Sequence, residues 1–121
     1  MTKHKILIVD DSSAQLLQLK GVIEKTQCAV ITASSGKEAV QKAKAEKPHL
    51  IFMDIVMDDM DGYSACREIN SDPATKDIPV VFVSTKKQKA DQLWALKQGG
   101  RALISKPYTD EQILDQIKLY C

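Results

Sequence analysis

Cysteine and histidine are too few and too scattered in this chain to build a covalent scaffold or a soft-metal site. Cys28, Cys66 and Cys121 are odd in number and show no Cys-x-x-Cys spacing. Neither His4 nor His49 stands at a metal-ligand spacing from any of them. The sequence therefore predicts neither a disulfide framework nor a zinc site.

Long apolar runs and an excess of charge of one sign are also missing. The apolar run at the amino end is short and is followed by two aspartates, and no segment approaches the roughly 20 apolar residues of a membrane span. Seventeen basic residues against sixteen acidic ones give a net charge of +1, which offers no overall attraction to nucleic acid or to an anionic membrane. We expect a soluble, monomeric cytoplasmic protein.

The length allows one domain. A chain of 121 residues, of which 44% are hydrophobic, can form one ordinary globular core but has no room for a linker or a second domain. We therefore expect a single domain over residues 1–121. With no effector domain after the last predicted helix, the output would have to be a protein contact, unless the chain is a fragment of a longer one.

Strand and helix patterns alternate along the chain. Short apolar runs predict buried strands at residues 5–9, 29–33, 49–53, 78–83 and 102–105. Apolar residues three and four apart predict helices at about 12–25, 35–47, 62–70, 87–98 and from 109 onward. Ser12, Ser35 and Thr109 each precede a glutamate or glutamine by three residues, which predicts capping boxes. The alternation predicts an α/β fold: a five-stranded parallel sheet with helices on both faces.

Polar side chains stand where the predicted strands end. Asp10 and Asp11 follow the first strand, Asp54 the third, Ser84 the fourth and Lys106 the last. The carboxyl ends of parallel strands border one crevice, so these side chains are expected to converge there. A single aspartate at the end of a strand could equally be an acidic turn residue. Two strands that both end in carboxylates favour a binding site instead.

Three carboxylates in one crevice need a cation. Two unpaired carboxylates about 4 Å apart repel by roughly 4 kcal/mol at an effective dielectric near 20. Oxygen ligands without cysteine or histidine favour magnesium, which binds through one or two carboxylates plus a phosphate. Lys106 would add a compact positive charge, and the Ser84 hydroxyl would donate to a phosphoryl oxygen. The sequence therefore predicts a site for Mg²⁺ and a phosphoryl group.

Four segments in this order resemble the CheY-like receiver domain of two-component response regulators, over essentially the whole chain. They are Asp10-Asp11-Ser12, the segment MDIVMDDMDGY around Asp54, Ser84-Thr85 and Lys106-Pro107. The resemblance implies a flavodoxin-like (βα)5 fold with strand order 2-1-3-4-5. It also implies a cis peptide bond between Lys106 and Pro107.

The same resemblance implies a phosphorylation-activated switch and not an ordinary enzyme. Asp54 would accept a phosphoryl group from a phosphohistidine of a histidine kinase, and the protein would catalyse only its own phosphorylation and dephosphorylation. Ser84 and Lys106 would contact the phosphoryl oxygens. Magnesium would be held by Asp10 or Asp11, by Asp54 and by the backbone carbonyl of Val56.

Output would pass to a downstream protein through the face made by the fourth helix, fifth strand and fifth helix. Basic residues dominate residues 86–106, where Asp91 is the lone acid among Lys86, Lys87, Lys89, Lys97, Arg101 and Lys106. A solvated helix face is the alternative explanation of this pattern. Trp94, within KADQLWALKQGGRALISKP, resembles the tryptophan of PilH-like receivers from type IV pilus chemotaxis-like systems, which implies a role in twitching motility.

Two positions depart from the family pattern. Leu103 stands where the family usually has an aromatic residue, three positions before the strand-end lysine, so the familiar aromatic switch has no ring to use. Asp58 replaces the usual proline four residues after the phosphoacceptor.

Other classes of protein fit the pattern less well. A pseudo-receiver would keep the fold but not depend on phosphorylation, and the presence of all five polar positions disfavours it. An FMN-binding flavodoxin-like protein is disfavoured because aspartates after the first strand would repel a phosphate. A hydrolase with paired carboxylates would need a substrate pocket, and the sequence has no long loop to form one.

Overall fold

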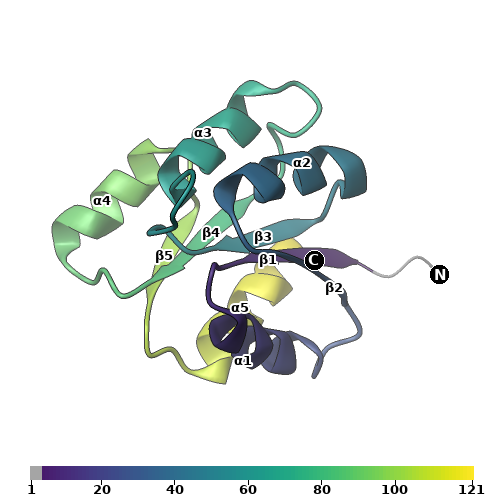
Figure 1. Cartoon of the computed structure of the whole chain (residues 1–121). Helices are drawn as coiled ribbons and strands as arrows, with labels where there is room; N and C mark the ends of the chain where they lie inside the picture. The colour runs from purple at the N-terminus through teal and green to yellow at the C-terminus, as the bar shows by residue number, and fades with distance from the viewer. Residues whose placement is uncertain (1–3) are drawn as a thin grey trace.

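The computed structural model describes residues 4–121 as one parallel sheet covered by helices on both faces (Figure 1). Residues 1–3 of the predicted domain lie outside the described residues. The elements in chain order are β1 (Lys5–Val9), α1 (Ser13–Ile23), β2 (Ala29–Ala33), α2 (Gly36–Glu46), β3 (Leu50–Met53), α3 (Gly62–Ser71), β4 (Val80–Ser84), α4 (Lys89–Lys97), β5 (Ala102–Ser105) and α5 (Asp110–Tyr120).

The sheet has the predicted topology. Its strand order is β2-β1-β3-β4-β5, and all four neighbouring pairs are parallel. The register places Val9 opposite Ala33 on one side and Met53 on the other, so β1, β2 and β3 end at nearly the same level. The predicted α/β fold with order 2-1-3-4-5 is therefore confirmed.

Two apolar layers hold the helices on the sheet. One face carries α2, α3 and α4, whose inward side chains include Ala39, Cys66 and Ala95. The other carries α1 and α5, with Ile23 and Ile113 buried against the sheet. Figure 1 shows α2 and α3 on one side of the strands and α1 and α5 on the other. Because both faces are covered, β1, β3 and β4 are buried along nearly their whole length, as their continuous apolar sequences predict.

The capping predictions are confirmed in part. Thr109 and Gln112 form the full reciprocal box at α5. Ser12 and Ser35 accept from the backbone N–H groups of Gln15 and Glu38 as predicted. The return contact of Glu38, however, goes to the backbone N–H of Ser34, one residue earlier than a capping box requires. Each cap still provides an acceptor for an otherwise unpaired N–H group.

Some boundaries differ from the sequence-based ones by one to two residues. Strand β4 begins at Val80 and not at Ile78, because the Ile78 N–H bonds to Thr75 O in a turn and Pro79 has no N–H to donate. The same strand runs on through Ser84, which the sequence placed just after it. Helix α4 begins at Lys89, since Gln88 forms the cap with Asp91.

No helix within residues 4–121 has the length and apolarity needed to cross a membrane.

Candidate functional site

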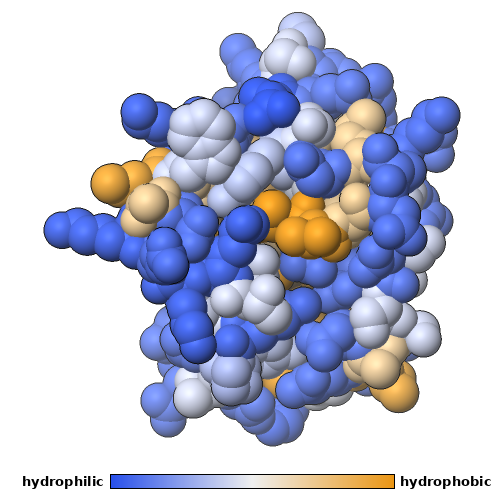
Figure 2. Space-filling view, turned by 60° about the vertical axis from the view of Figure 1, so that its left-hand side comes forward, coloured by the Kyte–Doolittle hydropathy of each residue, from blue (hydrophilic) through white to orange (hydrophobic). Residues whose placement is uncertain are grey.

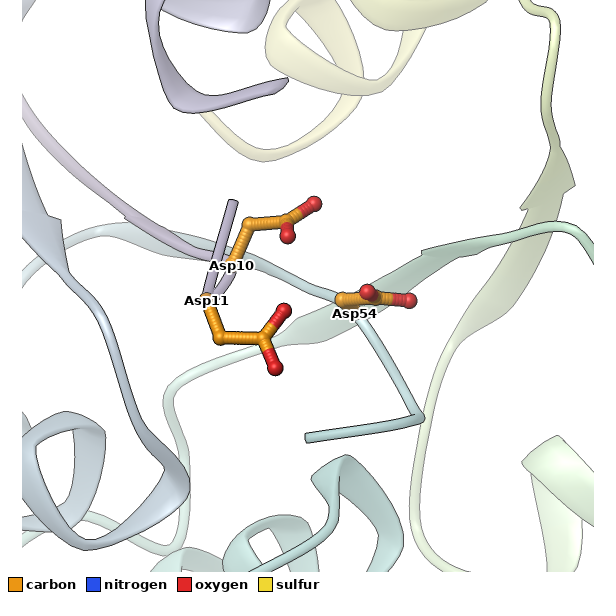
Figure 3. A group of neighbouring side chains, drawn as sticks. All are labelled: Asp10, Asp11 and Asp54. Carbon is orange, nitrogen blue, oxygen red and sulfur yellow. The ribbon is translucent and has the colours of Figure 1, made fainter. Parts of the chain in front are cut away.

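Three carboxylates meet at the carboxyl ends of two neighbouring strands. Asp10 and Asp11 follow β1 and Asp54 follows β3, and each offers an oxygen within 4.8 Å of the others. Figure 3 shows their carboxyl groups lying around a common space above the strand ends. The predicted convergence of these three residues is thus present in the structure.

Backbone hydrogen bonds fix where the aspartates stand. The Asp54 N–H donates to Val9 O at 2.9 Å, and the Asp10 N–H donates to Ala33 O at 3.1 Å, so both residues still lie on the ladder between strands. Asp10 Oδ1 accepts from the Ser12 N–H at 2.9 Å, and Asp54 Oδ1 accepts from the Ile55 N–H at 2.8 Å. Each of these two carboxylates thereby keeps its second oxygen for a partner in the crevice.

Lys106 is that partner. Its Nζ lies 2.9 Å from Asp10 Oδ2 and 3.8 Å from Asp54 Oδ2, and the side chains of Lys106, Asp10 and Asp54 are only 15%, 10% and 14% exposed. Burial raises the pKa of Asp54 above its ordinary value, the Lys106 ammonium opposes that rise, and the Asp10 charge adds to it. One ammonium among three carboxylates leaves the crevice short of positive charge.

The donor set fits a hard divalent cation. All three acidic ligands offer oxygen, and Asp11 is exposed at the mouth of the crevice, where a partly hydrated ion could be reached. A cation would also favour the ionised form of Asp54, which burial disfavours. Val56 lies two residues after Asp54 with an exposed side chain, and the role of its carbonyl as a ligand stays a prediction.

Ser84 and Lys106 come from adjacent strands. Ser84 is 1% exposed at the end of β4, and its backbone carbonyl accepts from the Lys106 N–H at 2.7 Å. Its hydroxyl oxygen accepts a long bond from the Lys86 N–H at 3.4 Å, which leaves the hydroxyl proton to donate. The Lys106-Pro107 peptide bond is cis, as predicted.

The sequence did not reveal the roles of Asp59, in the loop between β3 and α3, and of Gly62, the first residue of α3. Gly62 donates its N–H to Ile55 O at 2.7 Å, and a Cβ there would lie 2.1 Å from the carbonyl oxygen of Asp54, so only glycine fits. Backbone N–H groups, that of Met60 first, hold the pKa of the exposed Asp59 carboxyl below its ordinary value. In the sequence, Gly62 was predicted only as the start of a helix, and no pattern distinguishes Asp59 from the acidic residues around it.

The fold and the site together define a doubly wound α/β protein with an acidic crevice, bridged by a lysine, at the carboxyl edge of its sheet. Similarity to known proteins identifies the family within this broad class. The chain belongs to the response regulator receiver domain family, which matches residues 6–118. Receiver domains are phosphoacceptor signalling modules. Membership of this family therefore favours a receiver over the FMN-binding protein considered from the sequence.

Two relatives and one solved structure place the chain within the family. It is 40% identical over 113 residues to the protein PilH of Pseudomonas aeruginosa, a match covering 93% of each chain. It is 31% identical over 114 residues to the response regulator PleD of Caulobacter vibrioides, where the match covers 94% of this chain but only 25% of PleD. The signal receiver domain of a signal transduction histidine kinase from Syntrophus aciditrophicus has a TM-score of 0.87 at 32% identity, covering 97% of this chain and 89% of that one.

Proposed function

We propose that this protein is a two-component signalling switch that takes a phosphoryl group from a histidine kinase onto Asp54. The observation that carries the proposal is the convergence of Asp10, Asp11 and Asp54 with Lys106 at the carboxyl edge of the sheet. An acidic crevice alone would only bind cations. The adjoining ammonium, close to the carboxylate that terminates the central strand, adds the group that a transferred phosphoryl needs.

The reaction follows from the side chains present. A carboxylate oxygen of Asp54 attacks the phosphorus of the phosphohistidine, a P–O bond forms, the P–N bond breaks, and the departing imidazole nitrogen takes up a proton. Lys106 would shift from Asp10 toward a phosphoryl oxygen, and the Ser84 hydroxyl would donate to another. A bound Mg²⁺ would neutralise the carboxylates and the developing phosphoryl charge.

Two hydrogen bonds would carry the change from the crevice to α4. The Ser105 hydroxyl donates to Lys86 O at 3.1 Å, joining the residue before Lys106 to the loop after Ser84. The Gln92 side-chain amide donates to Leu103 O at 3.1 Å and joins α4 to β5. Movement of Ser84 and Lys106 toward a phosphoryl group would strain these links, so the α4–β5–α5 face would signal the phosphorylation state.

The likeness to PilH and the Trp94 segment support a role in a chemotaxis-like system that controls type IV pilus motility. The protein would act in the cytoplasm as a monomer and pass its signal to a downstream protein. The second candidate, a pseudo-receiver that signals without phosphorylation, shares the fold and is separated by the experiment below.

Phosphotransfer from the histidine kinases of the source organism tests the proposal. Each kinase is first labelled with ATP, then mixed with wild-type protein or with Asp54→Asn in Mg²⁺. We expect one kinase to lose its label to the wild-type protein within seconds to minutes, and Asp54→Asn to take up none. If every kinase keeps its label, the pseudo-receiver is the better description. If the variant is labelled equally well, Asp54 is not the phosphoacceptor.

A further inference from the structure

The hydroxyl of Tyr108 is buried close to the acidic crevice without a hydrogen bond. Tyr108 stands two residues after Lys106, and its side chain packs, partly buried, on the layer that holds α1 and α5. Its hydroxyl oxygen is buried and bonds to none of residues 4–121. Burying a hydroxyl without a partner costs free energy, and a phenylalanine would fill the same apolar layer without that cost. A buried polar group of this kind needs a physical reason, and catalytic sites are one place where such groups occur.

A small cavity adjoins both this tyrosine and the site. Tyr108, Lys106, Asp10 and Asp54 line the same cavity, whose volume is about 10 Å³. A space of that size holds one water at most. Figure 2 turns the carboxyl edge of the sheet toward the viewer and shows a mostly hydrophilic surface there. The Tyr108 oxygen has no part in that surface because it is buried, but a single water or a small turn of the ring can bridge it to a neighbouring acid.

Two carboxylates lie close enough to the hydroxyl to affect it. Burial raises the pKa of Tyr108, and the charges of Asp110 and then Asp10 raise it further. The Asp110 carboxylate is paired with Lys25 at the surface, and phosphoryl transfer gives that pair no reason to open. Asp10 Oδ2 is paired with Lys106 Nζ at 2.9 Å, and this is the contact that Lys106 leaves if it turns to a phosphoryl oxygen. Asp10 is therefore the acid whose oxygen becomes free.

Asp10 needs another donor once Lys106 leaves. The Asp10 side chain is only 10% exposed, and its Oδ1 already accepts from the Ser12 N–H. A buried carboxylate oxygen that loses its partner is costly, more so than a neutral group. A protonated phenol suits such an oxygen, because hydrogen bonds to charged acceptors are the stronger ones. A donor to Asp10 would therefore lower the free energy needed to release Lys106.

We propose that Tyr108 is a positioning residue for phosphoryl transfer, whose hydroxyl donates to Asp10 Oδ2 when Lys106 turns away to the phosphoryl group. Tyr108 touches neither the phosphorus nor the attacking oxygen; it pairs with Asp10 and so frees the lysine. The inference rests on the proposed function for the moment at which Lys106 moves. The same hydrogen bond should also form whenever the lysine is absent, which allows a test without any phosphoryl group.

A double-mutant cycle in the metal-free protein tests the bond. Urea denaturation compares Tyr108→Phe in the wild type and in the Lys106→Met background, where Asp10 has lost its ammonium. In the wild type the hydroxyl has no partner, so its removal should leave the unfolding equilibrium constant within about twofold. In the Lys106→Met background the same change should raise that constant about tenfold, because a hydrogen bond to a buried carboxylate is lost.

Two control variants separate this bond from general packing and charge effects. Tyr120 is also a partly buried tyrosine on the same layer but stands at the far end of α5, so Tyr120→Phe should have the same effect in both backgrounds. Asp110→Asn removes the other charge that acts on Tyr108. The tenfold coupling should persist in that variant.

Beryllofluoride with saturating Mg²⁺ tests the same bond when Lys106 is present but displaced, and does not depend on whether Lys106→Met folds. Fluorine NMR measures the beryllofluoride bound to the protein during titration. Tyr108→Phe should need about tenfold more beryllofluoride for half-saturation than the wild type, because the bond to Asp10 exists only in the bound state. Tyr120→Phe should match the wild type.

The proposal is overturned if Tyr108→Phe changes the unfolding equilibrium equally in both backgrounds, or if it leaves half-saturation by beryllofluoride unchanged. Phosphorylation of Asp54 is measured separately by intact mass. A wild-type protein that is phosphorylated while Tyr108→Phe shows neither effect contradicts the role of Tyr108 alone. A protein that is never phosphorylated but shows the tenfold coupling contradicts the switch and leaves the hydrogen bond between Tyr108 and Asp10 standing.

Discussion

Lys106→Met is expected to destabilise the metal-free protein by about 3 kcal/mol, the lower end of the range for removing one partner of a buried ion pair. The lysine is 15% exposed, and its ammonium lies within reach of two carboxylates that are 10% and 14% exposed. Without it, the carboxylates of Asp10 and Asp54, which are largely buried, repel each other, and the exposed Asp11 adds to that repulsion. Urea denaturation of the metal-free protein measures the loss.

Two controls test whether the loss comes from the acidic cluster: a matched ion pair on the surface, and the addition of Mg²⁺. Lys25→Met removes the cation of a pair with Asp110 whose side chains are 60% and 47% exposed, so it should cost no more than about 1 kcal/mol. Saturating Mg²⁺ should shrink the deficit of Lys106→Met, because it supplies the missing charge, and should not change that of Lys25→Met. Equal losses in the two variants, or a deficit that Mg²⁺ leaves untouched, would show that Lys106 does not balance the acidic cluster.

Leu103→Ala is expected to cost on the order of 2 to 5 kcal/mol of stability. Leu103 is 7% exposed and packs in the layer that holds α2, α3 and α4 on the sheet. Leu119→Ala, at a leucine that is 68% exposed, should stay within about 0.5 kcal/mol of the wild type. Thermal or urea denaturation compares the two.

The conservative variants Leu103→Ile and Leu103→Met should preserve signalling as well as volume. Leucine has no ring to rotate and no hydroxyl to exchange partners, so we assign the coupling to the bonds Ser105–Lys86 and Gln92–Leu103 O. The readout is the change in Trp94 emission on adding beryllofluoride and Mg²⁺. Ser105→Ala and Gln92→Leu should reduce that change, whereas Leu103→Met should keep it.

Two outcomes would contradict this route. One is a Leu103→Met protein that folds but shows no change in Trp94 emission on adding beryllofluoride and Mg²⁺, since that would mean that the Leu103 side chain itself carries the coupling. The other is a wild-type protein in which beryllofluoride leaves Trp94 unaffected, since that would mean that α4 does not respond.

The sequence predicted the strands and the crevice well because both depend on local patterns. Short apolar runs mark buried parallel strands, and a residue just beyond such a run must stand at the carboxyl edge of the sheet. That is why the convergence of Asp10, Asp54 and Lys106 could be predicted from the order of residues alone. The strand order itself came from the resemblance to receivers, because periodicity does not say which strands are neighbours.

What the sequence did not reveal depends on contacts between distant segments. The need for glycine at position 62 arises from the carbonyl of Asp54, which the returning loop brings within 2.1 Å of a would-be Cβ. The start of α2 likewise lies against the loop after β3, where a Cβ on Gly36 would stand 2.2 Å from the carbonyl oxygen of Met60. Leu93, Trp94 and Leu96 of α4 are each more than half exposed. The sequence did not predict this exposure, because polar and apolar residues are spread almost evenly around the helix and do not indicate which side faces the sheet.

Intact-mass measurement after incubation with acetyl phosphate tests the central claim most directly, since it needs neither the kinase nor the partner. The wild-type protein with Mg²⁺ should gain one phosphoryl group, and peptide mapping after reduction of the acyl phosphate should place it on Asp54. Asp54→Asn should gain none, and excess EDTA should prevent the adduct in the wild type. An adduct that persists in Asp54→Asn, or that forms equally well in EDTA, would contradict the account.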